Sequence, residues 1–212
     1  MALNDPPTPP AGKRKRMPRA ERERQMIDVA VQVFAENGFL AVSMDDIAAR
    51  VGVSKPMLYE YFNSKEGLLI AALRDARAEL RAATEEALAG AMSAEDALRR
   101  GLLAYFRFMR QRRDAWSLLR HELGFLGATA SAEIEAIRRQ QTELHVEHLR
   151  QFAPRATNQE IEVAAEILVG ACERMAVWCE RKGNVSPELA TELTLNVIWG
   201  GLSGLPVAAD PR

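Results

Sequence analysis

One short segment combines an amine, a thioether and two phenols within seven residues. It reads Lys55-Pro56-Met57-Leu58-Tyr59-Glu60-Tyr61-Phe62. At helical spacing Leu58 and Phe62 point inward, which predicts that the other side exposes Lys55, Met57, Tyr59 and Tyr61. An amine can donate to guanine O6 and N7, a thioether can touch the thymine methyl, and phenol hydroxyls can bind phosphates or bases. The segment is therefore a candidate for contact with duplex DNA.

A second chemical feature is a basic N-terminal arm. Residues 1–24 contain seven Lys or Arg against three acidic residues, although the whole chain has a formal net charge of −1. The positive charge is therefore local, as for a segment that binds a polyanion. The arm includes Lys13, Arg14, Lys15, Arg16 and Arg19, which are placed to reach a neighbouring DNA groove. Basic tails often serve only solubility, so the arm alone leaves both interpretations open.

The sequence contains no set of residues with the spacing of a metal or catalytic site. Cys172 and Cys179 are seven residues apart in a helical segment, roughly 10 Å along the axis, which is too far for a disulfide. Neither they nor His121, His145 and His148 supply the four ligands of a zinc site. We expect two buried cysteines, a solvated face for His145 and His148, and no cofactor. A helical enzyme or small-molecule carrier is a rival hypothesis, but no Ser/His/Asp set supports it.

Composition narrows the class of protein. The 212 residues are 48% hydrophobic and 27% charged, which is typical of a soluble globular chain of one or two domains. No apolar run reaches the roughly 18 residues of a membrane span. The N-terminus is basic but has no apolar stretch of the kind found in secretory signals. A cytoplasmic protein that makes no membrane contact is the default expectation.

The elements around the candidate segment predict a helix-turn-helix. Residues 1–17 are proline-rich and without apolar periodicity, whereas the pattern after Pro18 favours a helix over 19–37. Ser43 and Asp46 resemble a capping pair that opens a helix of two turns. After a tight glycine turn, Ser54 can cap the segment described above, and two short helices joined in this way form a helix-turn-helix. An ordinary helical hairpin is the alternative.

The string from Ser43 to Leu68 resembles the DNA-binding domain of the tetracycline-repressor (TetR) family of bacterial transcription regulators. Its most specific part is Gly-Val-Ser-Lys-x-x-Leu-Tyr-x-Tyr-Phe-x-Ser-Lys at 52–65. The resemblance covers residues 19–69. Elsewhere the chain matches the family only in length and helical pattern. Pro56 stands where many members have Gly, which affects the expected operator preference and not the fold.

The resemblance implies that the helix over 55–61 enters the major groove and that Ser43 and Lys65 bind phosphates. The predicted DNA-binding residues are Lys13, Arg14, Lys15, Arg16, Arg19, Ser43, Met44, Ser54, Lys55, Pro56, Met57, Tyr59, Tyr61 and Lys65. Tyr59 could also serve packing, and Lys55 could contact only phosphate. We expect Asp45 and Asp46 to cap their helix and not to face DNA.

The rest of the chain predicts one all-helical domain. Further helices are expected at about 64–88, 94–112, 115–122, 131–152, 158–182 and 187–203, so the fold class is all-α with about nine helices. The expected domains are a disordered arm (1–17), a helix-turn-helix DNA-binding domain (18–66), a regulatory and dimerisation domain (67–205) and a disordered tail (206–212).

By the same resemblance, the last two long helices form a homodimer interface, for which their wide apolar faces are suited. The pocket for a small, apolar effector is expected to be lined by Tyr105, Met109, Trp116, Phe125, Met175 and Trp178, although each could be a core residue. The expected function is a ligand-responsive repressor that binds a palindromic operator as a homodimer. Activation is an alternative output, and a non-specific, nucleoid-type DNA binder is a second rival hypothesis.

Overall fold

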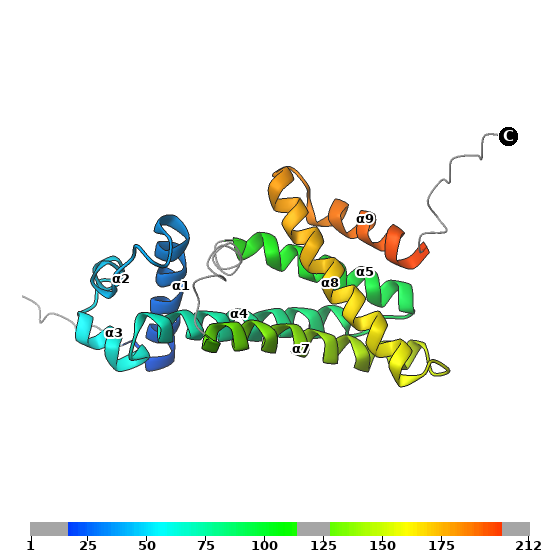
Figure 1. The fold of residues 1–212 in the computed structure, drawn as a ribbon, viewed down its shortest axis with the longest axis horizontal. Coiled ribbons are helices and arrows are strands. Elements are labelled where there is room, and N and C mark those ends of the chain that lie inside the picture. Colours follow the sequence, from blue (N-terminus) through cyan, green and yellow to red (C-terminus); the bar gives the residue numbers. More distant parts are fainter. Residues whose placement is uncertain (1–16, 114–127, 201–212) are drawn as a thin grey trace, which may run out of the picture.

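The computed structural model describes residues 17–113 and 128–200. Within these ranges the chain is all-helical, as predicted, and Figure 1 shows its eight helices. They are α1 (Arg19–Asn37), α2 (Met44–Val51), α3 (Lys55–Phe62), α4 (Lys65–Leu88), α5 (Ala94–Gln111), α7 (Ala128–Phe152), α8 (Asn158–Lys182) and α9 (Pro187–Gly200). No helix in the described ranges is both long and apolar enough to cross a membrane.

Short-range signals set the ends of α2 and the start of α3. The N–H of Asp46 donates to Ser43 Oγ at 3.2 Å and the N–H of Ser43 donates to Asp46 Oδ2 at 2.9 Å, which completes a capping box. Gly52 ends α2 in the left-handed conformation, with φ 81°. Ser54 occupies the N-cap position of α3, but its side chain makes no capping hydrogen bond. Pro56, in the first turn, favours the helical φ there instead.

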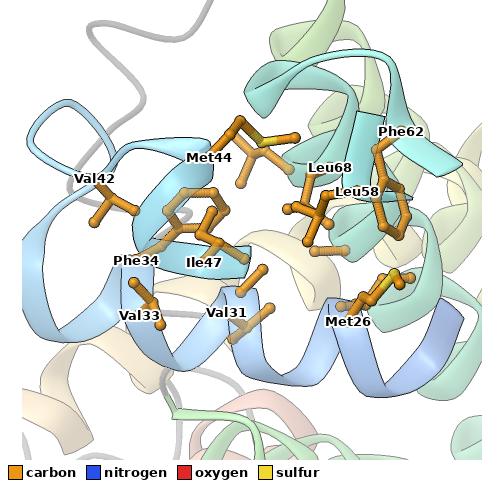
Figure 2. Packing of buried hydrophobic residues seen from close by; sticks show 14 of the residues in the cluster. Met26, Val31, Val33, Phe34, Val42, Met44, Ile47, Leu58, Phe62 and Leu68 are labelled. Atoms are coloured by element: carbon orange, nitrogen blue, oxygen red, sulfur yellow. The ribbon is translucent and has the colours of Figure 1, made fainter. Parts of the chain in front are cut away.

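The first three helices pack around one apolar core together with the start of α4 (Figure 2). Met26 and Phe34 come from α1, Ile47 from α2, Leu58 from α3 and Leu68 from α4, and none is more than 1% exposed. Because α3 contributes Leu58 from its middle, its rotation about its own axis is fixed by this core. The predicted helix-turn-helix is confirmed.

The turn between α3 and α4 leaves no room for a side chain. Ser64 Oγ accepts the backbone N–H of Gly67 at 2.9 Å, which caps α4. A Cβ atom built on Gly67 would lie 2.0 Å from the carbonyl oxygen of Phe62, at the end of α3. Only glycine therefore allows this close approach of the two helices.

Helix α4 belongs to two cores. Near its start, Leu68 and Leu69 are buried with α1, α2 and α3. Farther along, Leu80 packs with residues of α5 and α8, and Leu88 packs with residues of α5 and α7. In Figure 1 the helix-turn-helix lies at one end of this long helix and the other helices gather along the rest of it.

Helices α1, α2 and α3 with the start of α4 form a first unit, and the rest of α4 with α5, α7, α8 and α9 forms a second unit. In the second unit α5 packs against α4 and α9, and α7 packs against α4 and α8. Leu102 and Phe106 of α5 are buried with Leu168 and Cys172 of α8 and with Leu195 of α9. Cys172 is buried, as predicted, whereas Cys179 is partly exposed. Both thiols are free.

Several predicted boundaries differ from the structure or fall outside it. The described part of α7 already includes Ala128, Thr129 and Ala130, the three residues before the predicted start. The helix expected at 115–122, the arm 1–16 and the tail after residue 200 lie outside the described residues. The domain boundary at 66/67 stays a prediction, since it falls inside the continuous helix α4.

Leu58→Ala is expected to lower the free energy of unfolding by about 2–5 kcal/mol, because it opens a cavity where the side chain is 0% exposed. Leu40→Ala is the matched control: the same change at a residue that is 61% exposed should shift stability by less than about 0.5 kcal/mol. Urea denaturation of both variants at one protein concentration, followed by circular dichroism, measures the two values. Equal losses would contradict the packing of α3 described here.

Candidate functional site

The outward face of α3 is polar and accessible. Lys55, Pro56 and Tyr59 are exposed, whereas Met57 and Tyr61 are half-buried against the core. On the inner side Leu58 is 0% and Phe62 is 5% exposed. The predicted orientation of this helix is therefore confirmed for the two inward residues. What the outward residues contact remains a proposal.

Lys55 is paired within the chain. Its Nζ donates to Asp45 Oδ2 at 2.6 Å, and this hydrogen bond raises the pKa of the Lys55 amine. Asp45 is the second residue of α2, so the pair links the two helices of the helix-turn-helix. Both side chains are largely exposed, and an exposed ion pair of this kind is weak enough to open. The pair therefore holds Lys55 at the surface without locking it there.

The start of α2 differs from the prediction in two ways. The hydroxyl proton of Ser43 is donated to Asp46 Oδ2 at 2.6 Å, and this bond holds the pKa of the Asp46 carboxyl below its usual value. The capping role of Asp46 was predicted. A phosphate contact by the Ser43 hydroxyl would have to replace its bond to Asp46. Met44 is 5% exposed and lies in the core shown in Figure 2, so its side chain is removed from the set of predicted DNA contacts.

Lys65 has several partners inside the chain. Its Nζ donates to the carbonyl oxygens of Phe39 and Val42, each at 2.8 Å, and lies 3.5 Å from that of Leu40. The ammonium also sits 4.5 Å from the centre of the Phe39 ring. These contacts give Lys65 a role in holding the loop between α1 and α2. The predicted phosphate contact would need one of these bonds to open.

The described part of the basic arm lies beside α3. The guanidinium carbon of Arg19 is 4.7 Å from the centre of the Tyr61 ring, a cation–π arrangement that connects the start of α1 with α3. Lys13, Arg14, Lys15 and Arg16 lie outside the described residues.

A cluster of ion pairs joins the end of α5 to α1 and α4. Arg112, directly after α5, is 3.3 Å from Asp28 of α1 and 3.6 and 3.1 Å from Asp75 and Glu79 of α4. Arg24 of α1 also pairs with Glu79. The Arg112 side chain is 24% exposed, so these charges are screened less than those of a fully solvated pair. The cluster thus connects the end of α5 to α1 across the junction of the two units.

A cavity of about 230 Å³ lies in the second unit, between α4, α5, α7, α8 and α9. Its wall is mostly apolar and includes Leu80, Leu102, Phe108, Leu168 and Ile198. Tyr105 and Met109, two of the residues predicted for an effector pocket, line this cavity. Met175 does not: it packs against the core around Leu102.

The other three predicted pocket residues are not found in this wall. Trp178 is not among the residues that line the cavity, because it lies on a different side of α8 from Leu168 and Cys172. Trp116 and Phe125 lie outside the described residues. The pocket prediction is thus corrected for Met175 and Trp178.

The polar residues of the cavity were missed by the sequence analysis. Gln141, His145 and His148 of α7 line it, so the prediction of a solvated face for the two histidines is wrong. Burial lowers the pKa of His145 to about 4, helped by the nearby His148. The signal was the spacing of Ile137, Gln141 and His145, four residues apart, which places them on one helix face.

The charged residues of the wall are paired. Arg138 Nε donates to Glu173 Oε1 at 2.8 Å, and Arg77 Nη1 donates to Glu133 Oε2 at 3.3 Å. Burial raises the pKa of the Cys172 thiol to about 12, so this thiol is not activated as a nucleophile. Within residues 17–113 and 128–200 no group of acidic, His or Cys side chains could hold a metal ion.

A third feature is an exposed apolar surface on α8 and α9. Val163 and Ile167 of α8 are 51% and 61% exposed, and α9 exposes further large side chains, namely Leu189, Leu193, Val197 and Trp199. Other apolar residues of α8 are buried in the core, namely Ile161, Ala165, Leu168 and Cys172. The two helices thus have an inner and an outer apolar side.

Two family models match the chain. "Bacterial regulatory proteins, tetR family" matches residues 26–72, and "Tetracyclin repressor-like, C-terminal domain" matches residues 94–201. Together they span both the helix-turn-helix and the unit that contains the cavity, and the second alone covers half of the chain.

Named relatives and solved structures agree with these matches. The HTH-type transcriptional activator FasR of Mycolicibacterium smegmatis is 29% identical over 205 residues, covering 94% of this chain and 92% of that protein. A TetR-like regulator from Rhodococcus sp. RHA1 is 34% identical, with a TM-score of 0.71 over 90% of this chain and 100% of that one. FadR of Bacillus subtilis, solved in complex with stearoyl-CoA, has the same fold at 20% identity, with a TM-score of 0.75 over 86% of this chain and 99% of that one.

These relatives are transcriptional regulators and not enzymes, and their helix-turn-helix is the DNA-binding element that α2 and α3 form here. With both halves of the chain matched and a relative of 34% identity spanning nearly all of it, this protein belongs to the TetR family of bacterial transcriptional regulators.

Proposed function

We propose that the protein is a ligand-responsive regulator that binds a palindromic operator as a homodimer, with α3 in the major groove. The observation that carries this proposal is the two-sided character of α3. Leu58 and Phe62 anchor it in the core, while Lys55, Pro56 and Tyr59 face outward from a rigid support. A helix held in this way can present the same side chains to base edges in every complex.

The proposed DNA contacts follow from the exposed groups. Lys55 would leave Asp45 and donate to guanine, Met57 would approach a thymine methyl, and Tyr59 and Tyr61 would reach phosphates or bases. The Ser54 hydroxyl, which makes no capping bond, is free to donate to a phosphate. Pro56 would contribute shape and no hydrogen bond. Arg19 and the arm residues Lys13 to Arg16 would follow the backbone or enter the minor groove.

A homodimer would account for the exposed apolar surface of α8 and α9. Ile167 and Leu193 are large apolar side chains left in solvent, and two copies related by a twofold axis could bury them against each other. The same symmetry would place two α3 helices on one side of a duplex. One short helix reads only a few base pairs, so a pair would read a palindrome.

The response to a ligand would pass from the cavity to α1. A ligand that prefers one arrangement of α4 and α5 would shift Arg112, and through it Asp28, and so change the spacing of the two α3 helices. A coupling of about 1–3 kcal/mol would change DNA affinity about 5–150-fold. The apolar wall supports an apolar effector.

We propose repression as the output, because a dimer on an operator blocks access to the promoter. Activation is the second candidate, since the FasR relative is named as an activator. The position of the bound sites relative to promoters distinguishes the two: overlap with the promoter supports repression, and sites upstream of it support activation.

Selection of bound fragments from the source genome, with competitor DNA present, tests the main proposal. We expect a palindrome whose half-site centres are about 34–36 Å, or a multiple of that distance, apart. Lys55→Ala should relax the preference at particular positions by about 1–3 kcal/mol. Similar affinity for all duplexes would instead support the non-specific, nucleoid-type binder.

Lys65→Ala is the companion variant to Lys55→Ala. Because its ammonium holds the 39–42 loop, we expect a lower melting temperature and weaker binding to every duplex, with an unchanged salt dependence. A direct phosphate contact would instead lower the slope of log affinity against log salt by about 1 and leave the melting temperature unchanged.

Asp45→Asn is expected to strengthen binding to specific and non-specific duplexes alike, by about fivefold at low salt. The change removes a negative charge beside the proposed groove contact and releases Lys55 from its pair. Glu85→Gln is the control, because Glu85 is an exposed carboxylate that pairs with Arg81 on α4, away from α3. Fluorescence anisotropy of labelled duplexes measures both, and weaker binding by Asp45→Asn would contradict the proposed position of Lys55.

Ile167→Glu is expected to shift the protein from dimer to monomer, because it would place a charge in the proposed apolar interface. Met92→Glu, a change at a side chain that is 88% exposed outside α8 and α9, should leave the dimer intact. Sedimentation velocity over a range of concentrations measures both. A monomeric wild-type protein, or an Ile167→Glu variant that dimerises normally, would exclude this interface.

A further inference from the structure

Several hydrogen-bonding side chains line the mostly apolar wall of the cavity. Gln141, His145 and His148 project from one face of α7, and Tyr105 of α5 lines the same cavity. The other lining residues of α5 are small or apolar, such as Gly101 and Leu102. A molecule in the cavity would therefore find hydrogen-bonding groups of α5 and α7 within a mostly apolar wall.

Two of these side chains have a buried polar atom that no described residue satisfies. The Tyr105 hydroxyl and Gln141 Nε2 are buried and have no hydrogen-bond partner within residues 17–113 and 128–200. Buried donors are almost always paired in native proteins, since an unpaired one loses its hydration without compensation. Thr84, which also lines the cavity, donates to the Leu80 carbonyl at 2.8 Å and is thus satisfied. A bound molecule in the cavity could supply the partner that both atoms lack.

The arginine and glutamate side chains of the described wall already have partners within the chain. Among the described lining residues, Arg138 and Glu173 pair with each other at 2.8 Å, and Arg77 pairs with Glu133. His145 is neutral near pH 7, because burial lowers its pKa to about 4. His148 Nδ1 lies 2.8 Å from the Leu144 carbonyl oxygen, to which it donates. A carboxylate or an ammonium would meet no unpaired Arg or Glu side chain among the described lining residues, so its burial would be costly.

We propose that this cavity binds a small, mainly apolar molecule with one uncharged hydrogen-bonding group, such as an ester, ketone, amide or hydroxyl, held by Tyr105 and Gln141. This inference rests on the proposed ligand-responsive function and names the chemistry of its ligand. A cavity of about 230 Å³ is large enough for a small organic molecule.

Isothermal titration calorimetry of the full chain at pH 7 tests the inference with two pairs of probes. Methyl heptanoate and octanoate have the same carbon and oxygen atoms, but only octanoate is charged. Octanol and octylammonium form the second pair. We expect each uncharged probe to bind at least about tenfold more tightly than its charged partner. Equal or tighter binding of a charged probe, or no binding of any probe, overturns the proposal.

A cavity-filling variant shows whether the probes bind at this place. A Cβ on Gly101 would lie 3.6 Å from Leu88 Cδ2 and 3.9 Å from His145 Cε1, which are ordinary contacts, so Gly101→Leu should fold and extend into the cavity. We expect it to abolish the binding of methyl heptanoate while circular dichroism remains that of the wild type. Unchanged binding would place the probe elsewhere and overturn the proposal.

Two further variants test the proposed hydrogen bonds. Gln141→Leu and Tyr105→Phe should each weaken methyl heptanoate about fivefold, as for loss of one hydrogen bond, and leave binding of toluene, which has no polar group, unchanged. Gln141→Leu should also raise the melting temperature of the protein without probe, because it removes the unpaired amide. Unchanged ester affinity in both variants would overturn the assignment.

Operator affinity, measured on the same protein with and without methyl heptanoate, separates this inference from the proposed function. A protein that binds the uncharged probes in the cavity but no specific operator would contradict the proposed function and leave the cavity chemistry supported. A specific operator complex in a protein that prefers the charged probes would contradict only the cavity chemistry.

Discussion

Burial of one continuous helix, α4, in two separate apolar cores is the constraint on which the rest of the structure depends. Leu68 and Leu69 fix its start among α1, α2 and α3, while Leu80 and Leu88 fix the remainder against α5, α7 and α8. The same helix therefore lines the cavity and packs against α3. A change in the packing around Leu80 cannot be confined to the second unit, because the helix that carries it has no break before Lys65.

The first unit could be predicted from the sequence because its determinants are local. The capping box of Ser43 and Asp46 and the left-handed Gly52 act within a few residues and mark the ends of α2. The inward positions of Leu58 and Phe62 follow from helical spacing alone. The details that failed depend on neighbours distant in sequence. Met44 is next to the cap, yet it is buried because α1 and α4 pack over it.

The second unit could be predicted as helices but not as a site. Helical periodicity does not say which apolar side faces a neighbour and which stays outside, so Leu168 and Ile167, adjacent on α8, have opposite positions: 6% and 61% exposed. The cavity is enclosed by five helices, and His145 borders it only because α7 packs against α4. A histidine surrounded by polar neighbours in sequence gives no sign of that burial. Pairings such as Arg112 with Asp28, 84 residues apart, are equally invisible in the sequence.

The missing side chain at Gly67 has a mechanical consequence. Since the backbone of Phe62 occupies the place where a Cβ would stand, α3 cannot swing freely on α4, and the two helices turn together. α4 has 24 residues and is therefore about 36 Å long. If the whole helix were tilted by about 5° about its distal end, its start would be displaced by about 3 Å, close to the rise of one base pair. A tilt of α4 would thus be passed on to α3, because the close contact at Gly67 keeps the two helices together.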